Sequence, residues 1–206
     1  MCADRNPGEL AAGAFDLAAT LGSGQVFHWT NHGGVWWGAL GEEPIWIRQV
    51  GDSVLCTRGA EEKVRHFLAL DHDMGAIGAA LSKKGAALRK AVAFAPGLRI
   101  LRQPRWECLA SFITSPLKQI AHIRAISLTL REKYGERVGE GPDGQEIFSY
   151  PEAAALARAG ESALRRCALG YRAKGLAATA ALVADGCADL EGWAGLPTPD
   201  LRMRLM

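Results

Sequence analysis

The sequence lacks long apolar runs, clustered cysteines and a strong excess of charge of one sign. No stretch approaches the roughly 18 unbroken apolar residues of a membrane-spanning helix. The first ten residues include the charged Asp4, Arg5 and Glu9 and have no apolar core, so we expect no signal peptide. The five cysteines show no CxxC spacing, which argues against a zinc or iron–sulfur site: Cys2, Cys56, Cys108, Cys167 and Cys187. A reducing, cytoplasmic compartment of bacterial type is the expected location.

The charge balance is nearly neutral. The net charge of +2 is too small to indicate a nucleic-acid partner by itself, and 49% apolar residues exclude a disordered chain. The basic residues are nevertheless unevenly distributed along the chain. The segment 158–174 contains one acid, Glu161, and five basic residues: Arg158, Arg165, Arg166, Arg172 and Lys174. This cluster fits either a solvated helix face or an edge that faces phosphates.

The first third of the chain predicts a β-meander. Short runs rich in Val, Ile and Trp are separated by turn residues, with little room for helices between them. The expected strands are Val26–Thr30, Val35–Leu40, Ile45–Val50 and Ser53–Thr57. Four tryptophans fall in this region and are expected to pack against a covering helix: Trp29, Trp36, Trp37 and Trp46.

The remainder of the chain predicts helices, which makes the fold class α+β. The expected helices are Ala60–Leu70, Ala76–Leu81, Ala86–Phe94, Pro104–Ser115, Ile120–Tyr134, Pro151–Ala159, Glu161–Leu169, Tyr171–Ala184 and Pro199–Met206. A glycine-rich loop is expected at Gly139–Gln145, and Thr198 is placed as the N-cap of the last helix. The order is therefore an antiparallel sheet followed by an all-helical portion.

Two short segments combine residue types that bind ligands. Ser23–Trp29 contains a glycine turn that runs into the first predicted strand, and it serves either as a plain turn or as a backbone contact to a ligand. Leu169–Lys174 places Tyr171 and two bases at a helix start. That pattern fits a capped helix with a core tyrosine, or an anion site with an aromatic wedge for stacked bases.

Signals for other chemistry are weak. The residues between His66 and Asp73 fit no pair of metal ligands on one helix face, and the Asp71–Asp73 run suggests a helix break with an N-cap. The sequence contains no nucleophile elbow, no phosphate-binding loop and no carboxylate pair on one helix face. We therefore expect no metal site and no cofactor.

Three strings in one order resemble the 8-oxoguanine DNA glycosylase family. Ser23–Trp29 resembles the family's Ser-Gly-Gln-x-Phe-x-Trp element, and Gln103–Ile113 with the following Ile120 and Ala121 resembles its helix pair. Leu169–Ala173 matches its Leu-Gly-Tyr-Arg-Ala element. The resemblance implies an antiparallel sheet domain, TBP-like in that family, over residues 1–101. It also implies an incomplete helix-hairpin-helix glycosylase domain over residues 102–206.

The resemblance implies base-excision repair as the function. Members of the family remove oxidised purine from damaged double-stranded DNA after flipping the lesion out of the stack. A lysine amine then attacks C1′, and the resulting Schiff base supports strand cleavage as an AP lyase. The implied partner is damaged duplex DNA in the nucleoid, and the implied state is a monomer without a membrane or metal-cluster partner.

The resemblance also implies site residues. Gly24 would accept the N7–H that distinguishes the lesion from guanine, which has an acceptor there. Tyr171 would wedge into the duplex, and Arg172 would meet the cytosine opposite the lesion. Lesion-base recognition falls on Gly24, Gln25 and Phe27, and DNA binding on Leu117, Lys118, Gln119, His122, Tyr171, Arg172 and Lys174.

The sequence departs from the family at the position that fills the flipped base's place. The family often has three consecutive asparagines where this chain has Leu117, Lys118 and Gln119. Leu117 could still fill the gap sterically, and Lys118 could meet a phosphate. His122 stands where an arginine often reads the opposite cytosine, so the resemblance leaves the preferred opposite base open.

The chain has no match to the family's catalytic lysine, which lies on a Gly-x-Gly-x-Lys hairpin. None of the seven lysines corresponds to it, and the hairpin would follow Met206. We therefore expect a truncated chain without catalytic residues and without activity on its own. Two alternatives remain open: a non-catalytic module that binds damaged DNA through Gly24, Tyr171 and Arg172, and an enzyme that uses Lys118 as a substitute amine.

Overall fold

The structure is a computed structural model that describes residues 6–206, apart from the side chain of Asp143. Cys2 and the rest of residues 1–5 lie outside the described part. The chain forms two units, one made of residues up to 103 with 137–148, and the other of residues 104–136 with 149–206. The predicted domains 1–101 and 102–206 stay a prediction, and residues 137–148 belong to the sheet unit in this division.

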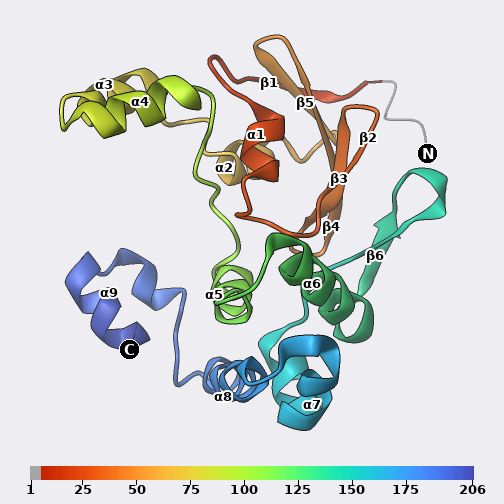
Figure 1. The fold of residues 1–206 in the computed structure, drawn as a ribbon. Helices are drawn as coiled ribbons and strands as arrows, with labels where there is room; N and C mark the ends of the chain where they lie inside the picture. Colours follow the sequence, from red (N-terminus) through yellow and green to blue (C-terminus); the bar gives the residue numbers. More distant parts are fainter. Residues whose placement is uncertain (1–5) are drawn as a thin grey trace. The chain divides into compact units, whose positions relative to one another are not determined.

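The first unit is built on a five-stranded antiparallel sheet in the order β1-β5-β4-β3-β2 (Figure 1). Its strands are β1 (Gly8–Ala11), β2 (Thr30–His32), β3 (Val35–Leu40), β4 (Glu43–Val50) and β5 (Ser53–Cys56). The predicted meander is thus confirmed for three of its four strands. The strand β1, which pairs with β5, lies in a segment where no strand was expected. The expected α+β class, with an antiparallel sheet followed by helices, is confirmed.

The predicted strand over 26–30 is wrong for residues 26–29. These four side chains are all buried in succession, whereas a strand that pairs in a sheet sends alternate side chains to opposite faces. The ring Nε2 of His28 lies 2.9 Å from the carbonyl oxygen of Ala39, so a side chain rather than a backbone ladder links this segment to β3. The ladder begins only at Thr30, opposite Trp37.

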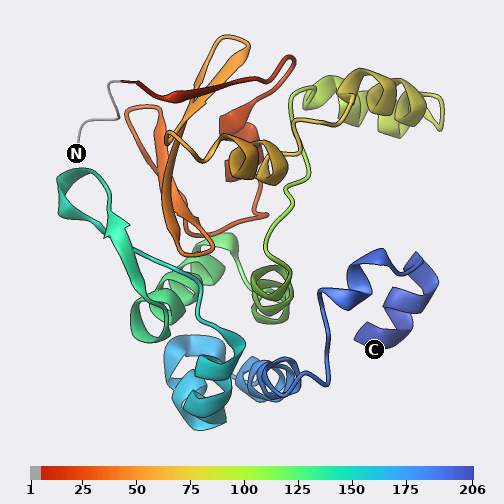
Figure 2. The same ribbon diagram turned by 180° about the vertical axis from the view of Figure 1, so that it is seen from behind.

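Two short helices cover one face of the sheet, as Figures 1 and 2 show from opposite sides: α1 (Leu17–Gly22) and α2 (Glu61–Phe67). The core between these helices and the sheet contains Ile45 and Ile47 of β4. Trp29 stacks on Phe67 of α2 with ring centroids 5.6 Å apart. Burial of these large apolar side chains is the main favourable term in this unit.

A β-hairpin from later in the chain covers the opposite face of the sheet. Strands β6 (Arg137–Glu140) and β7 (Glu146–Phe148) pair antiparallel, and Ile147 packs with Trp37 and Trp46. The expectation that all four tryptophans pack against a helix is therefore wrong for these two. The physical reason is the period of two along β4, which sends Trp46 to the face opposite Ile45 and Ile47.

The first unit also carries a helical hairpin, α3 (Met74–Ser82) and α4 (Ala86–Phe94), which pack on each other. No residue of these two described helices is buried. The predicted N-cap at the Asp71–Asp73 run is confirmed, because the Asp73 carboxylate accepts a hydrogen bond of 2.9 Å from the Ala76 N–H.

The second unit is helical. Its helices are α5 (Arg105–Thr114), α6 (Ile120–Tyr134), α7 (Ala153–Leu164), α8 (Arg172–Ala184) and α9 (Thr198–Leu205). Gly160 has φ +72° inside α7, and this non-helical residue separates the two short helices that the sequence predicts there. Leu156, Leu164, Leu169 and Leu176 are fully buried in the core of this unit.

Two further predictions of local structure are wrong. Gly139–Gln145 is not only a loop, because residues 139 and 140 pair in β6 and only the stretch from Gly141 to Gln145 forms the turn. Thr198 is not an N-cap, since α9 begins at Thr198 itself after Pro197, and no side chain caps it. The fixed φ of proline suits both Pro197, just before the helix, and Pro199, in its first turn.

The four described cysteines are free thiols. Burial raises the pKa of the Cys56 thiol to about 11. In the part of the chain that the structure describes, no helix has the length and apolarity needed to cross a membrane.

The close contact between Gly38 and Trp29 generates a test of the sheet unit. A Cβ at position 38 would lie 2.7 Å from Cδ2 of Trp29, whereas a Cβ at Gly22, the last residue of α1, would meet nothing within 4 Å. We expect Gly38→Ala to lower the free energy of unfolding by about 1–3 kcal/mol through overpacking. Gly22→Ala should be neutral or stabilising by up to about 1 kcal/mol. Urea denaturation followed by tryptophan fluorescence measures both, and equal stabilities would contradict the packing.

Candidate functional site

The glycine turn at residues 23–25 is held by the side chain of Gln25. Its amide nitrogen donates to the Arg99 carbonyl at 2.9 Å, and its amide oxygen accepts from the Leu101 N–H at 2.9 Å. The Gln103 side chain in turn donates to the Gln25 carbonyl at 2.9 Å. Gln25 therefore fastens the turn to the segment 99–103 and fixes the half-exposed Gly24, whose φ of +85° suits glycine.

The other expected lesion-recognition residue, Phe27, is buried with 7% of its surface exposed. Behind the turn, the guanidinium of Arg99 is also buried and donates to the carbonyls of Ala69 at 2.7 Å and Ala12 at 3.3 Å. In this structure Gln25 thus holds the turn and Phe27 is buried, while Gly24 is half-exposed.

In the helical unit, the loop between α5 and α6 presents an exposed leucine. Leu117 has 94% of its surface exposed and adopts φ +56°, in the left-handed region that non-glycine residues rarely occupy. The side chain of the next residue, Lys118, is bonded to the protein, because its Nζ donates to the Ala168 carbonyl at 3.3 Å. Gln119 is exposed and precedes the first residue of α6.

The second exposed tip lies at the start of α8. Tyr171 has 62% of its surface exposed, and the guanidinium carbon of Arg172 lies 4.4 Å from the centre of its ring. Arg172 is buried, and its Nη2 donates to the carbonyl of Pro116 in the α5–α6 loop. Lys174, one turn further along the helix, is exposed.

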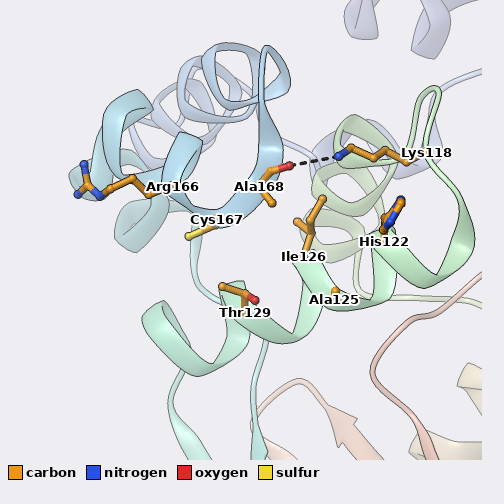
Figure 3. A pocket seen from close by; sticks show the side chains of 8 residues that line it. All are labelled: Lys118, His122, Ala125, Ile126, Thr129, Arg166, Cys167 and Ala168. Atoms are coloured by element: carbon orange, nitrogen blue, oxygen red, sulfur yellow. Dashed lines mark hydrogen bonds between the residues drawn. The ribbon is translucent and has the colours of Figure 1, made fainter.

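A pocket of about 390 Å³ lies between α6 and the turn at residues 166–168 (Figure 3). Its lining consists of Lys118, His122, Ala125, Ile126, Thr129, Arg166, Cys167 and Ala168. Lys118 reaches across toward Ala168, whereas the Arg166 guanidinium points away from the pocket and donates to the Ser162 carbonyl at 3.2 Å. The lining contains no acidic side chain, so its electrostatics favour an anionic or acceptor-rich ligand.

The structure thus brings together most of the expected DNA-binding residues of the helical unit. Lys118 and His122 line one pocket with Ala168, and two hydrogen bonds join the loop at residues 116–118 to the 168–172 segment. Sequence reasoning missed Phe112 and Ile120, which flank the same loop with 71% and 58% of their surfaces exposed. Both lie within the strings that carry the family resemblance, so those strings were the available signal.

A buried ion pair fixes the two helices that carry this loop. The Arg131 guanidinium of α6 donates to the Glu107 carboxylate of α5 and lies 5.3 Å from the centre of the Tyr150 ring. Burial raises the pKa of the Glu107 carboxyl, and the adjacent guanidinium offsets part of that rise. Burial also raises the pKa of Tyr150 above its ordinary value.

The described residues contain no cluster of three metal-ligating side chains. The candidate acids and histidine at positions 71–73 are used locally. Arg102 forms an ion pair with Asp71 at 2.7 Å and donates to Nε2 of His72 at 2.7 Å, while Asp73 caps α3. The Arg102 guanidinium also lowers the pKa of Asp71.

The chain is similar in sequence and in fold to N-glycosylase/DNA lyases. A family model described as the 8-oxoguanine DNA glycosylase N-terminal domain matches residues 9–109. The N-glycosylase/DNA lyase OGG1 of Arabidopsis thaliana is 29% identical over 173 residues, which is 79% of this chain and 47% of that protein. The N-glycosylase/DNA lyase of Saccharomyces cerevisiae is 39% identical over 85 residues, 41% of this chain and 22% of that protein. The chain therefore spans about half the length of the Arabidopsis relative.

Solved structures share the fold of this chain over most of its length. MBOgg1 in complex with a low-affinity DNA ligand has a TM-score of 0.87 and 26% identity, covering 98% of this chain and 73% of that one. The Clostridium acetobutylicum 8-oxoguanine glycosylase/lyase, in complex with double-stranded DNA containing cytosine opposite 8-oxoG, has a TM-score of 0.87 and 26% identity. That match covers 97% of this chain and 72% of the other.

The buried pair predicts a large cost for removing one partner. We expect Arg131→Met to lower the free energy of unfolding by about 3–5 kcal/mol, because Glu107 is left as a buried charge. The double variant Glu107→Leu/Arg131→Met should lose less than the sum of the two single changes. As a control, Arg165→Met removes the exposed pair with Glu161 and should cost about 0.5 kcal/mol or less. Additive losses in chemical denaturation would refute the pairing.

Proposed function

Since the chain belongs to the 8-oxoguanine DNA glycosylase family, we propose that it binds duplex DNA that carries oxidised purine and acts in base-excision repair. The family's reaction is removal of 8-oxoguanine followed by cleavage of the abasic strand. The observation that carries the proposal is the pair of exposed tips, Leu117 and Tyr171, on two loops that are joined by two hydrogen bonds in the helical unit.

The two tips have the chemistry needed to enter a base stack. A proteinaceous wedge is an apolar or aromatic side chain that is exposed before binding, and Leu117 and Tyr171 are 94% and 62% exposed. Tyr171 would stack on a base next to the lesion, and Leu117 would fill the space left by the flipped base.

The polar groups around the tips suit the DNA backbone and the base opposite the lesion. Gln119 and Lys174 are exposed and supply donors, and His122 supplies a ring that can donate or accept. Lys118 and Arg172 are already bonded to the carbonyls of Ala168 and Pro116.

Gly24 would read the lesion itself. A backbone carbonyl accepts the N7–H of 8-oxoguanine and faces an acceptor in normal guanine, so one group separates the two bases. The Gln25 bonds to Arg99 and Leu101 hold that carbonyl's turn in place. Recognition gains from such a rigid frame, because reading a single atom requires positioning to a fraction of an ångström.

The 206 residues by themselves are proposed to be inactive. The family's chemistry needs an amine at the flipped nucleotide's C1′, and no lysine of this chain matches that position. Lys118, the lysine beside the pocket, donates to the Ala168 carbonyl, so its amine is already bonded to the protein. Binding of damaged DNA without chemistry is the expected behaviour of this segment.

Binding assays test the wedge. At fixed salt, the chain should bind a duplex with 8-oxoguanine opposite cytosine more tightly than the matched guanine duplex. Tyr171→Ala should weaken binding to the lesion duplex by about 1–3 kcal/mol, the usual value for loss of one base–aromatic stack. Phe94→Ala removes an aromatic side chain that is 89% exposed in the sheet unit and serves as the control. Equal affinity for the lesion and plain duplexes would refute the proposal.

Product analysis tests the expected inactivity. Incubation of the 206-residue chain with a labelled 8-oxoguanine duplex should give neither abasic nor cleaved strand above the level of a mock preparation. Borohydride should trap no adduct that Lys118→Ala abolishes. Adduct that disappears in this variant would instead identify Lys118 as a substitute nucleophile.

A further inference from the structure

Two hydrogen bonds cross between the loops that carry the exposed tips. Lys118, next to Leu117, donates to the Ala168 carbonyl, and Arg172, next to Tyr171, donates to the Pro116 carbonyl. Each loop thus gives one cation to the other loop and accepts one in return. Figure 3 shows the first of these bonds, which spans the gap between Lys118 and Ala168.

Both loops contain backbone that is strained without support. Leu117 has φ +56° and Ala168 has φ +61°, and left-handed backbone costs a non-glycine residue about 1–2 kcal/mol. Such residues persist where the surrounding structure over-determines their conformation. One strained residue lies between Pro116 and Lys118, and the other supplies the carbonyl that Lys118 binds, so the crossed bonds act on the strained positions themselves.

Burial separates these two cations from a simple DNA-binding role. Arg172 has 7% of its surface exposed, and its donors also reach the Leu169 carbonyl at 3.5 Å. Its guanidinium lies against the Tyr171 ring and limits where that ring can go. Lys118 is half-buried and faces the protein, whereas Lys174 is exposed.

We propose that Lys118 and Arg172 are positioning residues that form a reciprocal staple, which holds Leu117 and Tyr171 at the separation needed to enter a duplex together. The staple rests on the proposed function, since its purpose is to order the wedge before DNA arrives. Preorganisation raises affinity by removing the cost of ordering the loops on binding.

The staple makes a distinct prediction for DNA binding by Lys118→Gln, Arg172→Gln and the double variant. The preference is the ratio of the affinities for an abasic-analogue duplex and for a plain duplex. If loss of the staple leaves Leu117 and Tyr171 in their binding arrangement about one fifth of the time, this ratio falls about fivefold. The loss should be the same with cytosine or adenine opposite the abasic site. The double variant should lose no more than the stronger single variant, because both changes break one unit.

Two other roles give different results and would overturn the staple. A phosphate contact lowers affinity for both duplexes equally and reduces the slope of log K against log salt by about 0.9. A contact to the opposite base lowers affinity only when cytosine stands there. Lys133→Gln, which removes an exposed cation at the end of α6, is the matched control for charge and should leave the preference unchanged.

A measurement without DNA separates failure of the staple from failure of the proposed function. In hydrogen exchange of the folded chain, Arg172→Gln should speed exchange in residues 115–119, and Lys118→Gln should speed it in residues 167–171. Unchanged exchange in both loops would overturn the staple even if damaged DNA is bound. A wild-type chain that binds abasic and plain duplexes equally would refute the proposed function, and the positioning role with it.

Discussion

The buried ion pair between Glu107 and Arg131 is the constraint on which the helical unit depends. Taking two charges out of water costs several kcal/mol for each ion, and their attraction offsets this only at close, well-formed geometry. The pair therefore permits little sliding of α5 along α6. Because the loop with Leu117 connects these two helices, their fixed geometry limits the conformations open to the loop. Within that frame, Lys118 and Arg172 each donate to a carbonyl of the loop opposite their own.

The sheet unit solves a similar problem with neutral groups. One amide side chain, Gln25, forms bonds with backbone groups more than 70 residues away in the sequence and so joins the Gly24 turn to the segment 99–103. Both faces of the sheet are covered, one by α1 and α2 and the other by the β6–β7 hairpin. The turn is thereby mounted on rigid structure, which suits a site that distinguishes bases by one backbone contact.

The surface proposed for damage recognition combines exposed apolar tips with cations that donate to protein carbonyls. In that proposal, apolar side chains such as Leu117 enter the base stack, while the internally bonded cations order the loops. Net charge is a poor guide to such a surface, because a net charge of +2 over the whole chain does not reveal a pocket whose lining contains no acidic side chain. The cations that remain exposed, such as Lys174, are the ones available to phosphates.

Local signals in the sequence were sufficient for much of the fold. The apolar runs at 35–40 and 45–50 predicted β3 and most of β4, and the helical period predicted α4 to α6 to within a few residues. Asp73 predicted the start of α3, because an N-cap depends on a backbone N–H only three residues away. The ordered motifs around Gly24, Gln103 and Tyr171 also indicated the family resemblance, since each motif requires particular residues at fixed spacing.

What the sequence could not determine depends on partners far away along the chain. Residues 26–29 have a strand's composition, yet burial of four successive side chains keeps them out of the ladder. Residues 137–148 form a hairpin because Ile147 finds Trp37 and Trp46 across more than 100 positions. Arg172 has the motif of a DNA contact, but only the tertiary structure places Pro116 within its reach. Helical period and helix caps depend on residues that are neighbours in the sequence. The direction in which a side chain points depends instead on the distant groups that packing of the core places beside it.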